Sequence, residues 1–420
     1  MLDKRFIRDN VDVVKHAVSV KGVDLDVDHL LELEVSTREL VGRVDAMQGE
    51  RKSFSKRFGG ADEETRAQMR ADNATFDERL KGVRAELADK QAELDGLLLS
   101  TPGIPWEGSP IGADESANVV IRTVGEKPTF DFEPLDHVEL IEKRGWAEFA
   151  RARNVSGERA YALAGDLVLL ERAVHSYALD LLVQRSFRPI SVPSLVKEAA
   201  LVGTGMFPKG REETYELPAD GLFLAGTGEV ALVGLHAGEI LDQAQLPILY
   251  AGISPCFRRE IGSAGRDVRG LLRVHQFEKV EQFVICENDE EESGRWHAVL
   301  LECAERILAD LGLAYEVVEC ATGDMGLGKF RMNDINTWMP SLEQYRETHS
   351  CSTLHDWQAR RASLRYRTAD GSIKFAHTLN NTAVATPRLL AALVENHQTA
   401  DGQVSVPEVL RPYLGGRDLL

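Results

Sequence analysis

The chain has 420 residues, 43% of them hydrophobic, and a formal net charge of −18 at pH 7. This composition suits a soluble protein of more than one domain, and the charge argues against indiscriminate nucleic-acid binding while allowing a specific nucleic-acid partner at a local basic patch. Five scattered cysteines, no membrane-length apolar run and a charged N-terminus predict a cytoplasmic protein without disulfides, a cysteine zinc site or a membrane partner.

The first predicted elements are two long helices between about residues 28 and 100. Apolar residues recur in alternating steps of three and four over 30–54 and again, after Gly59-Gly60, over 69–97. This is the a/d spacing of a coiled coil, so the segment predicts a long antiparallel helical hairpin. Polar residues interrupt the seam and predict a marginal hairpin rather than a rigid rod: Thr37, Arg51, Asn73 and Lys90.

A basic cluster lies near the tip of the predicted hairpin, on an otherwise acidic chain. Its members are Arg51, Lys52, Lys56 and Arg57. They are either an ordinary solvated helix end or a phosphate contact at the end of an arm. Residues 100–116 are rich in Pro, Gly and Ser and are typical of a linker. We therefore expect a hairpin domain over residues 1–110 and a second domain over residues 111–420.

The second domain mixes short β-rich runs, such as VVIRTV, LPILYAGI and FEKVEQFVI, with helical stretches. Strands that do not alternate regularly with helices favour an α+β domain around an antiparallel sheet. The sequence contains no Walker or GxGxxG phosphate loop. If this domain uses ATP, it does so with another architecture.

The stretch CFRREIGSAGRDVRGLLRVHQFEKVEQF, residues 256–283, predicts a strand, a glycine-containing loop and a second strand. Side chains on a strand alternate between faces, so Arg258 and Glu260 share one face of the first strand. One face of the second carries Arg273, His275, Phe277, Lys279 and Glu281. Such a face suits a nucleotide, with arginines for phosphates, Phe277 to stack on a base and Glu260 to accept from an exocyclic amine. The alternative is an exposed charged face, which would not need an aromatic residue.

The stretch TLNNTAVATPRLLAALVEN, residues 378–396, predicts a strand that leads into a helix. Thr386 is a good helix cap, and Pro387 suits the first helical position. Arg388 then falls in the first turn, where free backbone N–H groups favour an anion. The alternative is an arginine that faces solvent.

These two stretches resemble the second and third motifs of class II aminoacyl-tRNA synthetases, and nearly the whole chain resembles the seryl-tRNA synthetase family. FRPISVPSLV, with Pro193, resembles the dimer motif, GTGEV the serine-binding loop, and YRETHSCSTLHDWQARR a further family stretch. The resemblance implies a class II antiparallel sheet flanked by helices, preceded by the hairpin, in a homodimer. It implies activation of L-serine with ATP and Mg²⁺ to seryl-adenylate, followed by transfer to the 3′ end of tRNA(Ser).

The resemblance also implies roles for individual residues. Arg258 and Arg388 would be catalytic, with adenine between Phe277 and Arg388. The ATP site would comprise Arg258, Arg259, Glu260, Arg273, Val274, Phe277, Glu347, Thr348, His349, Ser350 and Arg388. The serine site would comprise Thr227, Gly228, Glu229, Arg258, Glu281, Asn380 and Thr382. Glu347 and Ser350 would hold Mg²⁺. The variable region of the tRNA would be gripped by Arg51, Lys52, Lys56 and Arg57.

Some positions depart from the family pattern. Asn336 stands where a carboxylate is usual, which predicts a somewhat raised serine KM. His349 adds a titratable ring that, if protonated near pH 6, would repel the metal and favour the phosphates. Such departures leave two alternatives open. One is a specialised paralogue for a biosynthetic pathway or antibiotic resistance, and the other is a non-catalytic coiled-coil binding protein that kept the fold.

Overall fold

In the computed structural model, the described residues are 1–59, 62–261 and 269–420, without the side chains at 55–59, 64–68, 70 and 71. The chain divides into two compact units, Met1–Pro102 and Gly103–Leu420. None of the described helices combines the length and the apolar character needed to cross a membrane.

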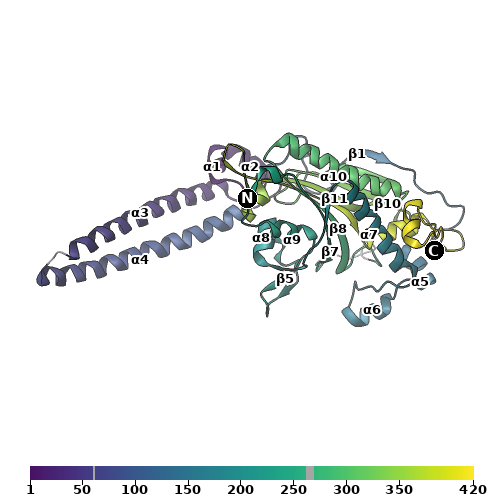
Figure 1. Cartoon of the computed structure of the whole chain (residues 1–420), viewed down its shortest axis with the longest axis horizontal. Helices are drawn as coiled ribbons and strands as arrows, with labels where there is room; N and C mark the ends of the chain where they lie inside the picture. Colours follow the sequence, from purple (N-terminus) through teal and green to yellow (C-terminus); the bar gives the residue numbers. More distant parts are fainter. Residues whose placement is uncertain (60–61, 262–268) are drawn as a thin grey trace. The chain divides into compact units, whose positions relative to one another are not determined.

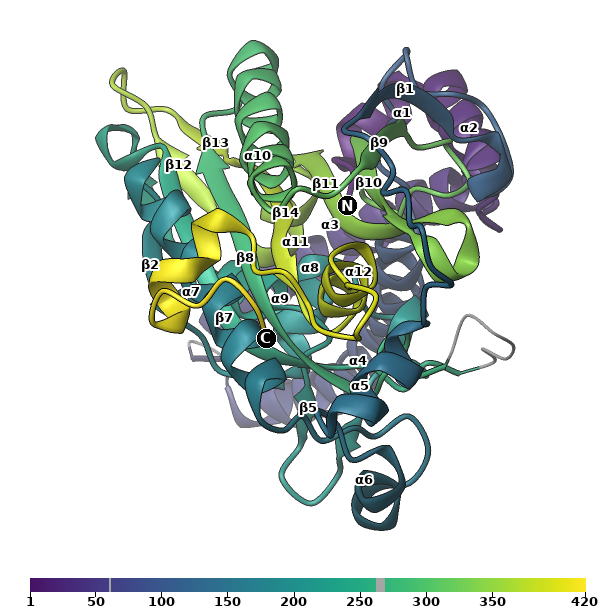
Figure 2. The same cartoon turned by 90° about the vertical axis from the view of Figure 1, so that its right-hand side faces the viewer.

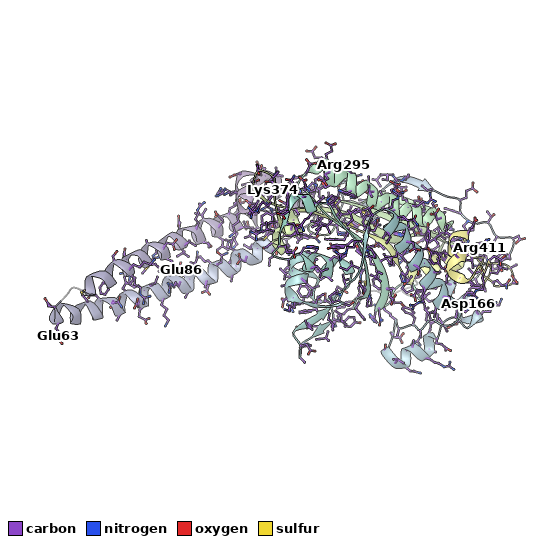
Figure 3. The ribbon with its side chains drawn as sticks, viewed as in Figure 1. Glu63, Glu86, Asp166, Arg295, Lys374 and Arg411 are labelled. Atoms are coloured by element: carbon purple, nitrogen blue, oxygen red, sulfur yellow. The ribbon has the colours of Figure 1, made fainter. Side chains whose placement is uncertain are left out.

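The first unit is dominated by a helical hairpin. Two short helices, α1 (Lys4–Asp9) and α2 (Val11–Val20), precede α3 (Val27–Gly59) and α4 (Glu63–Leu99). The two long helices lie side by side along their length (Figure 1). Polar side chains such as Glu86 extend outward from the hairpin (Figure 3). The helical hairpin predicted from the heptad spacing is confirmed.

The apolar seam of the hairpin is buried between α3 and α4. Its central cluster consists of Leu40, Val44, Met47, Leu80 and Val83, with Phe76 and Leu87 packed against it. Two of the polar interruptions, Arg51 and Lys90, find partners across the seam. Arg51 forms an ion pair with Asp77 at 3.1 Å, and Lys90 Nζ donates to Ser36 Oγ at 3.3 Å. The two helices are therefore held in register by polar contacts as well as by apolar packing.

The second unit is built on an eight-stranded sheet in the order β1-β9-β10-β11-β14-β8-β7-β2 (Figure 2). Its strands are β1 (Val119–Val124), β2 (Arg188–Ser191), β7 (Ile248–Phe257), β8 (Gln276–Cys286), β9 (Tyr315–Glu319), β10 (Arg331–Met339), β11 (Gln344–His355) and β14 (His377–Ala385). All neighbours pair antiparallel except β2 and β7, which run parallel. The predicted α+β class with an antiparallel sheet is confirmed.

Two small three-stranded sheets accompany the large one. The first consists of β13 (Ile373–Phe375), β12 (Arg365–Arg367) and β6 (Ile240–Asp242), and the second of β3 (Leu195–Lys197), β5 (Leu222–Leu224) and β4 (Glu216–Leu217). Two short helices, α5 (His137–Arg144) and α6 (Phe149–Ser156), follow β1 in the chain.

Helices cover both faces of the large sheet. One face packs against α7 (Asp166–Gln184), α10 (Glu290–Asp310) and α12 (Arg388–Asn396). The other packs against α9 (Gly228–Leu235) and α11 (Trp357–Ala362), and α8 (Glu198–Thr204) lies against these two helices. Strand β8 shows the division, because Val280 and Val284 belong to the first core and Phe283 and Ile285 to the second. Its even-numbered side chains thus face α10, and its odd-numbered side chains face α9.

Candidate active site

The odd-numbered face of β8 forms the wall of a polar cleft. Phe277 on this face is half-buried, whereas Lys279 and Glu281 are buried. The sequence pattern predicted that these three side chains share a face, and the two cores on either side of the strand agree with it. Arg273 and His275 precede the strand. His275 turns back, and its Nδ1 donates to the carbonyl of Arg258 at 3.0 Å.

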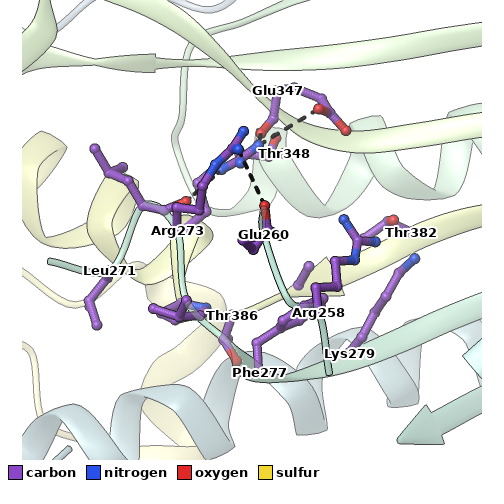
Figure 4. A pocket seen from close by; sticks show the side chains of 15 residues that line it. Arg258, Glu260, Leu271, Arg273, Phe277, Lys279, Glu347, Thr348, Thr382 and Thr386 are labelled. Carbon is purple, nitrogen blue, oxygen red and sulfur yellow. Dashed lines mark hydrogen bonds and ion pairs between the residues drawn. The ribbon is translucent and has the colours of Figure 1, made fainter. Parts of the chain in front are cut away.

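A cavity of about 180 Å³ opens over this wall (Figure 4). Eight of the predicted ATP residues line it: Arg258, Glu260, Arg273, Val274, Phe277, Glu347, Thr348 and Arg388. The guanidinium of Arg258 lies 5.3 Å from the centroid of the Phe277 ring. The carboxylate of Glu260 lies 3.3 Å from Arg273, as the dashed line in Figure 4 marks. The cavity thus joins three arginines, one aromatic ring and two acids.

Arg388 enters the cavity from the start of α12. Its guanidinium donates to the backbone carbonyls of Glu347 and Leu272 and lies 3.8 Å from the Glu347 carboxylate. The side chain keeps 31% of its surface exposed, so part of it is available to a ligand. The predicted helix cap is wrong. The helix begins at Arg388 with Pro387 as its cap, and the hydroxyl of Thr386 instead donates to Glu171 in α7 at 2.8 Å.

A β-bulge in β11 determines which of its side chains face the cavity. Ile335 of β10 lies opposite His349, and Asn336 lies opposite Glu347, so Thr348 is the extra residue. Directly opposed residues in an antiparallel pair share a face. Ser350 lies opposite Asp334, two residues from Asn336 on β10. Glu347 and Ser350 therefore share one face, although they are three residues apart.

The oxygen atoms on this face suit a hard divalent cation. A carboxylate and a hydroxyl are the ligands that Mg²⁺ prefers. Asp334, beside Ser350, is buried, and its Oδ1 has no hydrogen-bond partner in the described part of the chain. Burial and the nearby Glu347 carboxylate raise the pKa of Asp334 to about 7. A cation bound here would favour the ionised forms of Asp334 and Glu347.

His349 does not face the cavity, which corrects the expectation for its ring. The ring is 1% exposed, with Nδ1 2.8 Å from the Thr348 hydroxyl and Nε2 donating to the carbonyl of Ala383 at 3.0 Å. It shares the face of Ile335, a core residue. Burial lowers the pKa of His349 to about 4. The ring is therefore neutral near pH 6 and is turned away from the cavity.

The raised serine KM expected from Asn336 stays a prediction. Asn336 pairs with Glu347 on β11. The predicted serine residues lie on α9, β8 and β14, and β11 stands between β10 and β14. A carboxylate at position 336 would therefore lie beside Glu347, across β11 from the predicted serine residues.

The predicted serine residues form a buried polar cluster that adjoins the cavity. Thr227 caps α9 by accepting from the N–H of Glu229 at 3.3 Å. Its hydroxyl also lies 3.3 Å from the carboxylate of Glu281, which forms an ion pair with Lys279. Thr382 of β14 lies directly opposite Glu281 in the strand pairing. Three elements that are distant in sequence thus meet around one small polar volume.

The charges of this cluster are unbalanced. Burial raises the pKa of Glu281, Lys279 opposes this, and the neighbouring Glu229 carboxylate raises it further. Two carboxylates therefore face one ammonium group. A ligand with its own cationic group would restore neutrality.

Some predicted residues lie outside the cavity. The guanidinium of Arg259 donates to the backbone carbonyl of Glu212 at 3.0 Å, and the backbone N–H of Arg259 donates to the carbonyl of Glu213 at 3.1 Å. In the hairpin, Arg51 and Lys52 are exposed, and the side chains of Lys56 and Arg57 lie outside the described ones.

Sequence reasoning gave no role to two residues of the polar cluster, Lys279 and Gln358. Lys279 had a signal, because it stands on the predicted face between Phe277 and Glu281. Gln358 donates to Glu229 at 2.6 Å from 129 residues away. No local sequence pattern predicts a side-chain contact between residues so far apart in the chain.

Known proteins resemble this chain over its full length. The family model of the seryl-tRNA synthetase N-terminal domain matches residues 1–105, and that of the tRNA synthetase class II core domain (G, H, P, S and T) matches residues 214–397. A serine–tRNA ligase of Deinococcus radiodurans is 52% identical over 100% of this chain and 99% of its own. A serine–tRNA ligase of Symbiobacterium thermophilum is 41% identical over 98% of each chain. The crystal structure of seryl-tRNA synthetase from Pyrococcus horikoshii complexed with ATP superimposes with a TM-score of 0.89 at 36% identity, covering 100% of this chain and 99% of that one.

Proposed function

The chain belongs to the seryl-tRNA synthetase family and is a class II serine–tRNA ligase, and from this premise we propose how its residues divide the work. Its substrates are accordingly serine, ATP and tRNA. The two alternatives, a specialised paralogue and a non-catalytic binding protein, find no support among the relatives. The observation that carries the assignment of residues is the cavity lined by Arg258, Phe277 and Arg388, which shares Lys279 and Thr382 with the buried cluster around Glu281.

ATP is proposed to occupy the 180 Å³ cavity. Adenine would stack between Phe277 and Arg388, with Glu260 accepting from its amine. Arg258 would hold both the α-phosphate and the serine carboxylate, because it stands between the cavity and the polar cluster. The solved relative from Pyrococcus horikoshii, complexed with ATP, supports nucleotide use by this fold.

The chemistry proposed for these residues is alignment and charge neutralisation. A carboxylate oxygen of serine attacks the α-phosphorus of ATP, and pyrophosphate leaves. A ribose hydroxyl at the tRNA 3′ end then attacks the seryl carbonyl, and AMP leaves. Arg258 and Arg388 hold the reacting groups in line and neutralise charge that develops on the phosphate. The chain itself forms no covalent intermediate.

Glu347 and Ser350 are proposed to hold Mg²⁺, which when bound would neutralise charge on the ATP phosphates. We expect Glu347→Gln to raise the Mg²⁺ concentration for half-maximal serine-dependent ATP–pyrophosphate exchange by about tenfold, because an anionic ligand becomes neutral. Serine KM should stay unchanged. The control is Glu343→Gln, at an exposed position just before β11. Stoichiometric zinc in active protein, or an unchanged Mg²⁺ requirement in Glu347→Gln, would contradict the assignment.

Serine binding should weaken in acid because of Glu281. The pKa of this buried carboxyl is raised, so it gains a proton above the ordinary carboxyl range of about 4.3. Protonation removes the ion pair with Lys279 and an acceptor for the serine hydroxyl. We expect serine KM to rise as pH falls through this pKa, with ATP KM changing less. Exchange kinetics between pH 5 and pH 8 (a range of about three units around neutrality) measure this. A serine KM that is as pH-dependent in Glu281→Gln as in the wild type would assign the titration to another group.

Residues 1–110 are proposed as the tRNA-binding domain, with Arg51, Lys52, Lys56 and Arg57 near the tip as phosphate contacts. Exposure of Arg51 and Lys52 on an acidic chain supports this. We further propose that the enzyme is a cytoplasmic homodimer. The dimer-motif resemblance falls on β2 and the residues after it, and β2 is an edge strand of the large sheet. All five cysteines are buried and free, which suits a reducing compartment.

A further inference from the structure

Gln358 lies beside the proposed serine site without touching the cavity. It belongs to α11, and none of its side chain is exposed. Its Nε2 donates to Glu229 Oε1 at 2.6 Å and to the backbone carbonyl of Thr204 at 3.1 Å. Its Oε1 accepts from the hydroxyl of Thr378 at 2.8 Å. Every polar atom of the amide is therefore engaged.

The orientation of this amide is determined by its surroundings. A backbone carbonyl can only accept a hydrogen bond, so the group beside the Thr204 oxygen must be the NH₂. The amide cannot be turned around, and its second N–H must point at Glu229. Rotating it would set the Gln358 oxygen against a carboxylate and a carbonyl at once.

A second amide reaches the same carboxylate oxygen from another element. Asn380 Nδ2, on β14, donates to Glu229 Oε1 at 2.8 Å. Hydrogen bonds to an ionised carboxylate stabilise its charge. Both donors are neutral, so they stabilise the charge on Glu229 without cancelling it. Glu281 differs, because Lys279 supplies an opposing charge.

We propose that Gln358 is a positioning residue for serine recognition, which holds Glu229 so that its second oxygen, Oε2, faces the serine ammonium group. This rests on the proposed serine site. Donors from α11 and β14 together prevent the carboxylate from rotating, and they leave its negative charge for the ligand. Gln358 itself contacts no substrate and acts only through Glu229.

The first test is Gln358→Met in the full-length enzyme, which keeps the length of the side chain and removes its three hydrogen bonds. In pyrophosphate exchange, serine KM should rise about tenfold or more, with ATP KM within about twofold of the wild type. The matched control is Gln398→Met. Gln398 is also a buried amide, bonded to the backbone of Leu135 and Glu395. This control should lower thermal stability without changing serine KM.

The second test is a double-mutant cycle with Glu229→Gln. If Gln358 acts through Glu229, adding Gln358→Met to Glu229→Gln should raise serine KM by less than about twofold. If the increases in serine KM of the two single variants multiply in the double variant, the proposal is overturned and Gln358 has only a general packing role. An unchanged serine KM in Gln358→Met would overturn it as well.

Thr378→Val provides an independent variant of nearly the same shape, for use if Gln358→Met does not fold. It removes only the hydroxyl that bonds Gln358 Oε1. Serine KM should rise about threefold or more, with ATP KM unchanged, because the amide loses one of its anchors; no change would count against the proposal. Absence of serine-dependent exchange in the wild-type enzyme is a separate outcome, which would contradict the proposed function itself.

Discussion

Shortening the helical hairpin will lower tRNA charging by about 100-fold or more while leaving serine-dependent pyrophosphate exchange within about twofold of the wild type. The reason is that every residue proposed to bind serine or ATP lies in the second unit, whereas charging also needs the tRNA to be held. The first unit is compact by itself, and its tip carries the basic cluster. The measurement compares kcat/KM for tRNA with the exchange rate in the same preparations.

The structure indicates where the hairpin can be cut. Ser36 and Lys90 are in hydrogen-bond contact across it, so residues 38–89 can be replaced by a short glycine–serine turn. That deletion removes the whole Leu40–Val83 cluster, and it keeps the buried Leu30, Leu33 and Leu94 near the base. Undiminished charging by the shortened enzyme would refute a role for the hairpin in tRNA binding.

A variant that changes only charge tests whether the basic cluster itself contacts the tRNA, independently of the length of the hairpin. Changing Arg51, Lys52, Lys56 and Arg57 to Gln leaves the helices in place. Each lost phosphate contact should reduce the salt dependence of tRNA binding by about one unit of log–log slope. Arg51 also pairs with Asp77, so a further variant without the change at Arg51 tests whether helix pairing is disturbed. An unchanged salt slope would assign the cluster to the solvated surface.

Arg258→Met will lower kcat/KM for pyrophosphate exchange by about 100-fold to 1,000-fold, the magnitude expected when a donor to developing charge is removed. Arg258 lines the cavity beside Phe277 and is proposed to hold both substrates. Both serine and ATP kinetics should therefore be affected. Binding experiments with each substrate alone would show which contact contributes more.

Arg259→Met is the matched control for this variant. The two arginines are adjacent, yet Arg259 is bonded to carbonyls of the segment 212–213 and does not line the cavity. Its replacement should change exchange kinetics by less than about threefold. Equal losses in the two variants would show that the effect comes from disturbing the segment after β7 rather than from a lost substrate contact.

Much of the site could be predicted because it lies on regular elements. Alternation along β8 puts Phe277, Lys279 and Glu281 on one face, and heptad spacing predicts the hairpin seam. The expectation for His349 rested on its place in the chain between Glu347 and Ser350, and simple alternation would likewise put it on the face of Glu347. The bulge at Thr348 instead puts His349 and Glu347 on opposite faces. Neither Thr348 nor His349 is a residue such as glycine, which would have predicted a bulge here.

The role of Gln358 was not predictable from the sequence for a different reason. Its partners lie in α8, α9 and β14, and their proximity depends on how α11 packs under the sheet. Long-range side-chain contacts of this kind follow from tertiary packing. The same is true of Thr386, which suits a helix cap locally but bonds to Glu171 in the folded chain.

The bulge at Thr348 also changes how β11 tolerates insertion and deletion. Odd-numbered side chains face the cavity before Thr348, and even-numbered side chains face it after Thr348. Removing this one residue would make the alternation of side chains regular along the whole strand. Glu347 would then directly precede His349 and would keep the face of Ser350, because their partners Asn336 and Ile335 are already consecutive on β10. Position 348 is therefore the place in β11 where one residue can be lost without turning Glu347 away from the cavity.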